Sequence, residues 1–339
     1  MNIANIISDI KGPQFLDQLL EILKKAQRVT VTTHRDCDGD GVGAMLAFYF
    51  ALIKMKIKVR LLSVDAIPKK YSFLPGYSKI EVFNPDQVPE IGDLLIAFDT
   101  NDSRRIEPLA TWAQKSGAVL FIDHHPVLEK GPHPGHSSFI NTMAASTGEM
   151  TFDLIQSLKI EMDPEIAQCL YTSLVFDTQL FRFIRKSPRS HEIAAELMQH
   201  SFDPTEIHRR LFGNQTPEKL RFLAKALSEI EYLNEGKIAH LSLSYLDFQK
   251  FNVDPEASRD VVDTMMNVEG VEIAVLYRQE TINKIKVSIR SKGRYEVLSL
   301  AEKWNGGGHL YAAGATLENV ELTSLQKDML SWIKNHPLS

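Results

Sequence analysis

The amino-acid sequence predicts an α/β fold, in which a doubly wound, mostly parallel sheet is followed by a helical linker and a smaller α/β domain with a mixed sheet. Three observations lead to this prediction. Continuously apolar strand patterns alternate with helical patterns over the first half of the chain. A charged, helical stretch runs from 188 to about 235. Short strand patterns then return, and the length of 339 residues favours two domains.

The first half of the chain reads as alternating helices and strands. Strand patterns lie at 29–33, 58–65, 93–100 and 117–126. Helical patterns lie at 14–27, from about 43 to 55, and at 164–183. Ser146 and Glu149 have the spacing of a capping box, so we expect a further helix to begin there and interpret this pair as structural.

The second half gives a different pattern. Strands are expected at 237–244, 272–279 and 284–291, a helix near 298–304, and a glycine-rich loop at 305–316. The predicted domains are therefore a catalytic, metal-binding domain at 1–190, a helical linker at 191–235 and a substrate-binding domain at 236–339.

Composition restricts the kind of protein. A formal net charge of -5 argues against a protein that coats long nucleic acid, but it leaves a short anionic substrate open. The chain has only two cysteines, Cys37 and Cys169, and it begins without a signal-peptide pattern. No apolar run reaches the roughly 18 residues that span a bilayer. We expect a cytoplasmic protein without membrane contact, and the sequence leaves the oligomeric state open.

One stretch concentrates ionisable side chains where a strand ends. The first apolar run stops at His34, and Asp36, Asp38 and Asp40 then alternate through a glycine loop. Three carboxylates this close repel one another unless a cation lies among them, so a metal ion is the simplest explanation. A turn exposed to water is the alternative. An EF-hand calcium loop is excluded because Ala47 stands where the pattern requires Glu.

Two further strands end in acidic or histidine residues. One leads to Asp99, and the next ends in Asp123, His124 and His125. Because ligands of parallel sheets bind beyond the carboxyl ends of the strands, three such ends favour one common site. Asp177 lies in an otherwise mostly apolar helical run, where burial without a partner is costly, so we interpret it as a further ligand.

The candidate metal ligands are carboxylates and imidazoles without a thiolate. They are His34, Asp38, Asp40, Asp99, His124 and Asp177. This mixture suits Mn²⁺ or Mg²⁺, with iron or zinc as alternatives. Six ligands are too many for one ion with an open position, whereas two ions about 4 Å apart, bridged by a carboxylate, would use them all. Such a pair activates water for attack on phosphorus, so the sequence predicts hydrolysis of a phosphoester.

A second group of residues favours anion binding in the C-terminal half. Between 278 and 294 a single acid, Glu280, accompanies six basic residues, although solvated strand faces would give part of this pattern. The basic residues are Arg278, Lys284, Lys286, Arg290, Lys292 and Arg294. In the GGGH stretch at 306–309, glycines let backbone amides approach a phosphate, and His309 can donate to the same anion. A flexible turn is the alternative.

The order of these motifs resembles that of the DHH phosphoesterases that carry a DHH-associated C-terminal domain. The resemblance rests on His34 with Asp38 and Asp40, Asp99, the DHH triplet at 123–125, Asp177, and GGGH followed by AAG. It covers nearly the whole chain. Within this family, the chain length, the SIRS segment and the GGGH loop are most similar to the nanoRNase and pAp phosphatase group.

The resemblance implies a role for each site residue. One manganese ion would be held by His34, Asp38 and Asp99. The other would be held by Asp40, Asp99, His124 and Asp177, with Asp99 as the bridge. His125 would contact the scissile phosphate or the leaving group, and Asp123 would orient a histidine. Substrate would be bound from the second domain, with the active site in the cleft between the domains, by Arg278, Arg290, Ser291, Gly307, Gly308 and His309.

The implied function is manganese-dependent hydrolysis of short oligoribonucleotides to mononucleotides, with the 3′-phosphate of pAp as a further target. A phosphodiesterase for linear or cyclic dinucleotides would use the same site, and a non-catalytic nucleotide sensor is the alternative outside enzymes. RecJ-like action on long single strands is disfavoured by the acidic composition. Cys37 and Ala44 depart from the Pro and Ser that are usual in the family, and Asp36 is additional. These departures bear on the substrate more than on the metal site.

Overall fold

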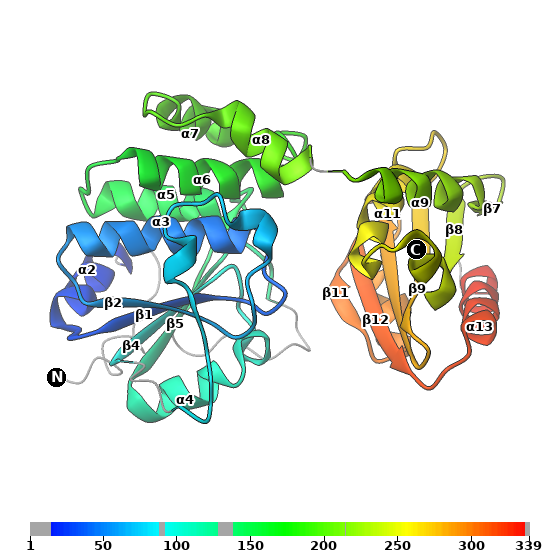
Figure 1. Ribbon diagram of the computed structural model, residues 1–339, viewed down its shortest axis with the longest axis horizontal. Coiled ribbons are helices and arrows are strands. Elements are labelled where there is room, and N and C mark those ends of the chain that lie inside the picture. Colours follow the sequence, from blue (N-terminus) through cyan, green and yellow to red (C-terminus); the bar gives the residue numbers. More distant parts are fainter. Residues whose placement is uncertain (1–14, 88–91, 128–137, 214, 336–339) are drawn as a thin grey trace. The chain divides into compact units, whose positions relative to one another are not determined.

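The computed structural model describes residues 15–87, 92–127, 138–213 and 215–335. The chain forms two compact units, Met1–Asn214 and Gln215–Ser339, each built on its own sheet (Figure 1). The predicted two-domain α/β fold is therefore confirmed. Position 14, where the first predicted helix was expected to begin, lies outside the described residues. Within the described ranges, no helix is both long enough and apolar enough to cross a bilayer.

The sheet of unit 1 is parallel throughout. Its strands are β1 (Val29–Thr33), β2 (Val59–Ser63), β3 (Glu81–Val82), β4 (Leu94–Phe98), β5 (Ala118–Asp123) and β6 (Ser138–Ile140). They lie in the order β3-β2-β1-β4-β5-β6, and each neighbouring pair is parallel. The chain winds outward in one direction from β1 and in the other from β4. Such a reversal opens a crevice at the carboxyl ends of the two central strands.

Helices cover both faces of this sheet (Figure 1). On one face a single hydrophobic core joins the strands to α2 (Phe15–Lys25), α3 (Gly39–Lys54), α5 (Thr147–Ser157) and α6 (Pro164–Asp177). The other face packs on α4 (Leu109–Ser116). In β4, Ile96 belongs to the first core while Leu95 and Ala97 belong to the second. Burial on both faces explains why the strands read as continuously apolar.

Glycine lets α3 lie close to α6. A Cβ atom added at Gly43 would lie 2.5 Å from the carbonyl oxygen of Cys169 and 2.8 Å from the Cβ of Ser173. A Cβ at Gly39 would lie 2.6 Å from the ring of Phe176. Because α3 begins at Gly39 rather than near 43, the acidic loop continues directly into the first turn of this helix. Asp40 is thereby part of a helix that packs against both β1 and α6.

Two boundaries differ from the prediction. Helix α6 ends at Asp177 instead of 183, and residues 178–187 form turns. The expected linker at 191–235 is divided between the units. The core of unit 1 includes α7 (Arg189–Leu197) and α8 (Pro204–Phe212), whereas α9 (Pro217–Ser228) packs in unit 2. The charged residues on the outer faces of these helices led to the prediction of a linker. Their inner faces carry buried Ile, Leu and Phe, which pack in the cores of the two units.

Unit 2 has a mixed sheet in the order β11-β12-β10-β9-β8-β7, in which only β8 and β9 pair in parallel. The strands are β7 (Glu231–Leu233), β8 (Ile238–Leu243), β9 (Ile273–Thr281), β10 (Lys284–Ser291), β11 (Gly307–His309) and β12 (Ala312–Glu318). One face packs on α9, α10 (Tyr245–Phe251) and α11 (Arg259–Met266). The other packs on α12 (Leu298–Lys303) and α13 (Leu322–Asn335).

The loop predicted at 305–316 is wrong, since this stretch forms β11 and the start of β12. Its small residues lack the side-chain alternation that identifies a strand, and only pairing with β10 and with each other reveals it. Short 3₁₀ helices complete the described elements at Lys69–Tyr71, Tyr77–Lys79, Ser103–Ile106 and Pro255–Ser258.

The close contact of α3 with α6 predicts the effect of Gly43→Ala. The new methyl group overlaps a backbone oxygen, so the helices must separate, and we expect a loss of about 1–3 kcal/mol in the free energy of unfolding. Thermal denaturation measures this loss. Gly307→Ala is the control because its new Cβ would have no atom within 4 Å. Equal melting temperatures for both variants would contradict the prediction.

Candidate metal centre

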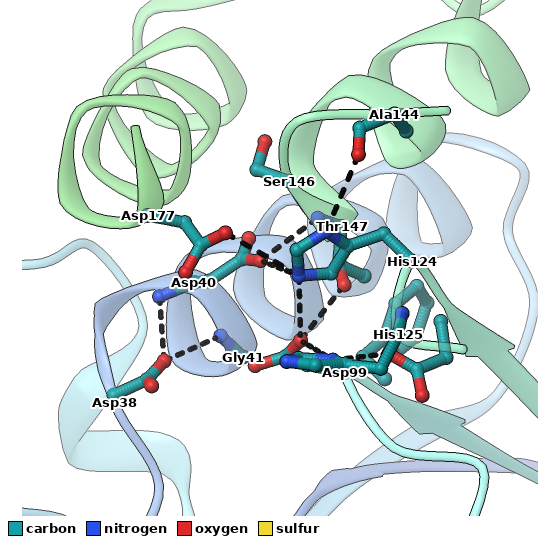
Figure 2. A network of polar contacts seen from close by, with 12 residues as sticks. Asp38, Asp40, Gly41, Asp99, His124, His125, Ala144, Ser146, Thr147 and Asp177 are labelled. Atoms are coloured by element: carbon teal, nitrogen blue, oxygen red, sulfur yellow. Dashed lines mark hydrogen bonds and ion pairs between the residues drawn. The ribbon is translucent and has the colours of Figure 1, made fainter. Parts of the chain in front are cut away.

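The predicted ligands lie together at the carboxyl end of the unit 1 sheet, where the strand order reverses (Figure 2). His34 follows β1, Asp99 follows β4, and His124 follows β5. The first turn of α3 and the residue before it add two carboxylates, and the last residue of α6 adds a third. These are Asp38, Asp40 and Asp177.

Three sets of side chains within the described residues have one potential ligand atom each within 4.8 Å of one another. The first set is His34, Asp38 and Asp99. The second set is Asp40, His124 and Asp177. The third set is Asp99, His124 and His125. Asp99 and His124 each belong to two sets, so the arrangement can hold two neighbouring cations; which residue binds which ion stays a prediction.

Asp38 is positioned by the start of α3. As the N-cap residue it has an extended backbone, and its Oδ1 accepts hydrogen bonds from the backbone N–H groups of Asp40 (3.0 Å) and Gly41 (3.4 Å) (Figure 2). Capping fixes the direction of the carboxylate without using both oxygens. Oδ2 therefore remains available for a cation.

Asp40 is fully buried and is held by the N-terminus of α5. Its two oxygens accept backbone N–H groups from Thr147 (2.8 Å) and Gly148 (3.0 Å), and Oδ1 also accepts the hydroxyl of Ser173. The helix N-terminus places partial positive charge beside this carboxylate. Burial, together with the charges of Asp99 and Asp177, nevertheless raises the pKa of Asp40 well above its usual range. The protein contacts alone do not balance the buried negative charge.

Asp99 lies at the centre of the cluster in a left-handed backbone conformation, with φ of 62°. Its Oδ2 is 3.3 Å from Nε2 of His34, and its Oδ1 accepts the hydroxyl of Thr147 at 3.0 Å. Burial alone would raise the pKa of Asp99, but the contact with His34 and the charge of His125 hold it well below its usual range. Asp99 is therefore the carboxylate most strongly kept ionised.

His124 has a buried nitrogen without a hydrogen-bond partner in the described structure. Its Nδ1 lies 3.3 Å from the carbonyl oxygen of Ala144, while Nε2 faces Asp177 (3.3 Å), Asp40 (3.6 Å) and Asp99 (3.8 Å). Burial and the charge of His125 lower the pKa of His124, which favours the neutral imidazole that binds metals. An unpartnered nitrogen among three carboxylates fits a divalent cation.

His125 is oriented by Asp123. Asp123 Oδ1 lies 2.8 Å from Nδ1 of the ring and accepts the backbone N–H of His125 at 3.1 Å. Asn101 donates to the other oxygen of Asp123 (2.7 Å) and to the His125 carbonyl (3.0 Å). Burial would lower the pKa of His125, but Asp123 and Asp99 raise it to about 9. The ring is thus held in place and protonated at neutral pH when no metal is bound.

Several residues at the site were not singled out from the sequence. Arg105 Nη2 lies 2.6 Å from Nδ1 of His34, whose Nδ1 is also 2.7 Å from the carbonyl oxygen of Arg35. Both contacts involve Nδ1, so Nε2 is the ring nitrogen that faces Asp99 and the metal set. Asn101 and Ser173 carry no sequence signal, because both act on residues distant in the chain. Thr147 could have been found, since it follows the predicted helix cap Ser146.

The capping prediction for α5 is confirmed in its main part. Ser146 accepts the N–H of Glu149 at 3.1 Å, but the Glu149 carboxylate accepts the N–H of Ala145 and the hydroxyl of Ser190. The buried Glu149 thereby ties α5 to the start of α7 and takes no part in the metal sets.

The predicted substrate-binding residues of unit 2 lie at one end of its sheet. Backbone register aligns His309 with Ala312 and Ala312 with Arg290, so β11, β12 and β10 place them in one row. Gly307 and Gly308 belong to the same edge strand. Burial lowers the pKa of Arg290. The Ser291 hydroxyl accepts backbone N–H groups of the turn that follows.

Arg278 differs from the expectation of a substrate contact. The residue is 4% exposed, and its guanidinium pairs with Glu256 (2.7 Å) and Glu280 (2.5 Å). It also donates to the carbonyl oxygen of Pro255 and to the Ser258 hydroxyl. Glu280 pairs with Lys284 as well, so part of the basic cluster is neutralised internally. Arg278 is thus held by contacts within unit 2, and its part in substrate binding stays a prediction.

Comparison with known proteins agrees with this geometry. Residues 28–174 match the DHH family N-terminal domain, and residues 235–335 match the DHHA1 domain. The bifunctional oligoribonuclease and PAP phosphatase NrnA of Thermus thermophilus is 32% identical over 317 residues, covering 93% of this chain and 92% of that protein. The Bacillus subtilis protein of the same description is 28% identical, covering 91% and 96%.

A solved structure shows the same fold. An exopolyphosphatase-related protein from Bacteroides fragilis superposes with a TM-score of 0.86 at 24% identity, covering 96% of this chain and 98% of that one. The chain therefore belongs to the DHH family and contains a DHHA1 domain. It is a hydrolase that acts on phosphoester bonds, as the sequence predicted.

The crowded carboxylates predict the behaviour of Asp177→Asn. Burial and the charges of Asp99 and Asp38 raise the pKa of Asp177 from 3.8 to about 8. Ionisation of this carboxylate therefore lowers the stability of the folded protein progressively as the pH rises from 3.8 to about 8. Asparagine cannot ionise. Without metal we expect the variant to melt about 2–4 °C above the wild type at pH 8.5, corresponding to about 1 kcal/mol. The difference should shrink toward pH 4, and added Mn²⁺ should stabilise the variant less than the wild type.

Thermal denaturation with chelator, and then with Mn²⁺, measures both effects. Asp17→Asn, which changes an exposed carboxylate in the first turn of α2, is the control. If metal-free Asp177→Asn melts below the wild type at pH 8.5, repulsion does not destabilise the ionised Asp177 carboxylate, and the prediction is contradicted.

Proposed function

We propose that this chain is a manganese-dependent phosphoesterase that acts in the cytoplasm and hydrolyses short oligoribonucleotides to mononucleotides. Adenosine 3′,5′-bisphosphate, which would lose its 3′-phosphate, is the second proposed substrate. The observation that carries the proposal is the pair of metal-binding sets that contain Asp99 and His124, the two residues that a third set brings together. The similarity to oligoribonuclease and PAP phosphatase proteins supports the choice of substrate, since it extends over both units.

The donor atoms favour hard divalent ions. His34, Asp38 and Asp99 would hold one ion, and Asp40, His124 and Asp177, joined by Asp99, would hold the other. Carboxylate oxygens with imidazole nitrogens and no thiolate suit Mn²⁺, with Mg²⁺ as the alternative. When bound, the two ions lower the pKa of water and stabilise negative charge on the phosphoryl oxygens.

The protein fixes the orientation of two of these ligands. The N-terminus of α5 holds Asp40 through two backbone N–H groups, so its oxygens are fixed before an ion arrives. The Ala144 carbonyl lies beside Nδ1 of His124, which directs Nε2 toward the carboxylates. Fixed ligands reduce the reorganisation that accompanies the reaction.

His125 is proposed as the group that gives a proton to the leaving oxygen. Asp123 fixes the ring through Nδ1, and the contact with this carboxylate favours the protonated ring. Asn101 holds Asp123 in turn. The proton would pass from Nε2 of His125 to the oxygen of the departing nucleoside or nucleotide.

Unit 2 is proposed to bind the phosphates of the substrate. Arg290, Ser291 and the glycine-rich strand that ends at His309 lie at one end of its sheet. The backbone N–H groups of Gly307 and Gly308 can approach an anion closely because no Cβ stands in the way. Arg290 brings a positive charge to the same row.

Hydrolysis of a labelled RNA ladder tests the proposal directly. The ladder runs from a dinucleotide to a long single strand, beside adenosine 3′,5′-bisphosphate, with Mn²⁺ and with chelator. We expect mononucleotides from the shortest oligomers, and loss of the 3′-phosphate, only with Mn²⁺. Absence of turnover on every substrate while Mn²⁺ is bound would refute the proposal. Cyclic dinucleotide hydrolysis and nucleotide sensing would then be tested next.

The proposed role of His125 predicts a specific defect for His125→Gln. Losing the proton donor should lower kcat by about 10²- to 10⁴-fold. The bound Mn²⁺, measured by elemental analysis, should stay at the wild-type level. His200→Gln, which changes a histidine in the turn after α7, is the control. An unchanged kcat, or a loss of Mn²⁺ equal to the loss of activity, would contradict the role.

A further inference from the structure

The turn that follows Asp177 has an unusual composition. We call residues 178–187 the basic turn. Its sequence, TQLFRFIRKS, contains three basic residues and two phenylalanines, and no acid occurs between Asp177 and Glu192. In a chain with a net charge of -5, such a stretch directly after a metal-centre residue is a local excess of positive charge.

The backbone of the basic turn is held in a fixed course. The buried Thr178 hydroxyl donates to the Leu174 carbonyl (2.7 Å) and accepts the N–H of Phe181 (3.1 Å), and the Thr178 carbonyl accepts the N–H of Phe183 (3.0 Å). The Phe181 ring stacks on His191 of α7, with ring centroids 4.9 Å apart. Phe181 is therefore the anchor of the turn.

Five residues of the turn have left-handed backbone conformations, and none is Gly, Asn or Asp. They are Gln179, Leu180, Phe181, Arg185 and Lys186. This conformation is unfavourable for residues with a Cβ atom, so the surrounding contacts must impose it. Strain of this kind is concentrated at functional sites. Here it belongs to the segment that leaves the metal centre.

Phe183 is displayed to solvent instead of being buried. Its side chain is 55% exposed, and the guanidinium of Arg182 lies 5.6 Å from the centre of its ring. The neighbouring Leu180 is 43% exposed. An exposed aromatic ring beside a guanidinium offers a stacking surface for a flat base and a cation for its phosphate.

The basic turn begins directly after Asp177, so its cations lie within ten residues, along the chain, of a side chain of the metal centre. Arg185 and Lys186 are exposed, and neither forms an ion pair with a carboxylate in the described residues. A ligand that carries both a ring and phosphates would satisfy the aromatic and the cationic groups at once.

We propose that the basic turn is a nucleotide-binding platform of unit 1, on which Phe183 stacks a base of the substrate while Arg185 and Lys186 contact its phosphates. This inference rests on the proposed function and assigns the recognition of the base to unit 1. The ligand class is a nucleoside phosphate with an exposed base, as in single-stranded RNA. Every base can stack on an aromatic ring, so the platform requires a base but does not discriminate among the four bases.

The test compares an RNA dinucleotide with matched dinucleotides in which one base is replaced by a stable abasic residue. In Phe183→Leu we expect KM for the intact dinucleotide to rise about tenfold relative to the wild type. For the abasic dinucleotide that lacks the base stacked on Phe183, KM should be the same in the variant and the wild type. Phe183→Trp should restore the wild-type KM because tryptophan also stacks. Equal changes on intact and both abasic substrates would overturn the stacking role.

The charged residues are tested by Lys186→Gln. We expect KM to rise for all these substrates and its dependence on salt to weaken. Lys56→Gln is a matched control, since Lys56 is also exposed, has φ of 60° against 56° for Lys186, and follows the far end of the 16-residue helix α3. Equal effects of the two substitutions would overturn the contact with phosphate.

Binding of adenosine 5′-monophosphate, a product of the proposed reaction, separates the two hypotheses. Calorimetry with Mn²⁺ should show weaker binding to Phe183→Leu than to the wild type. If the wild type binds through Phe183 but hydrolyses neither RNA nor bisphosphate, the proposed function fails and the platform stands. If Phe183→Leu and the wild type bind adenosine 5′-monophosphate equally well, the platform hypothesis fails. A change of molecular mass in Phe183→Leu, without a change in KM, would instead assign Phe183 to contact with a second copy.

Discussion

The structure of unit 1 depends on the repulsion among carboxylates that are buried around one point. Asp40 and Asp99 have almost no exposure, and Asp38 and Asp177 lie beside them. Ionised groups this close are destabilising in a medium of low dielectric unless positive charge compensates them. The starts of α3 and α5 supply part of this charge through backbone N–H groups, and His34 and His125 supply more. Burial and mutual repulsion still raise the pKa values of Asp40 and Asp177, so these protein contacts leave part of the negative charge uncompensated, as expected of a site for divalent cations.

This requirement explains the packing of the sheet and its helices. The first turns of α3 and α5 must both reach the carboxyl ends of β1 and β4. The backbone of these turns therefore lies very close to neighbouring side chains. A Cβ at Gly41 would lie 2.2 Å from the Thr33 hydroxyl, and one at Gly148 would lie 2.2 Å from the Ser173 hydroxyl. Ser173 lies on α6 and donates to Asp40, so the same close contact that packs three helices also orients a metal ligand. Stability and function share these glycines.

Sequence reasoning succeeded where chemistry is local to the chain. Strand ends at Asp99 and at Asp123 to His125 could be read as one site, because parallel strands must present their carboxyl ends at one edge. It missed contacts between residues that are distant in the chain. Arg278, which is expected to bind substrate, pairs inside unit 2 with Glu256, 22 residues before it. The strands at 307–309 and 312–318 were read as a loop because glycine and alanine pack in a sheet only when a neighbouring strand is present.

The sequence by itself determined the fold class, the family, the residue types of the metal centre and the order in which they occur. These follow from periodicity and from motifs, which depend on neighbours along the chain. Only the tertiary structure decided how six candidate ligands and His125 divide into three sets, how Asn101 and Asp123 fix the His125 ring, and how Phe183 is exposed to solvent. Distances and burial between residues far apart in sequence arise from packing, and the linear pattern does not contain them.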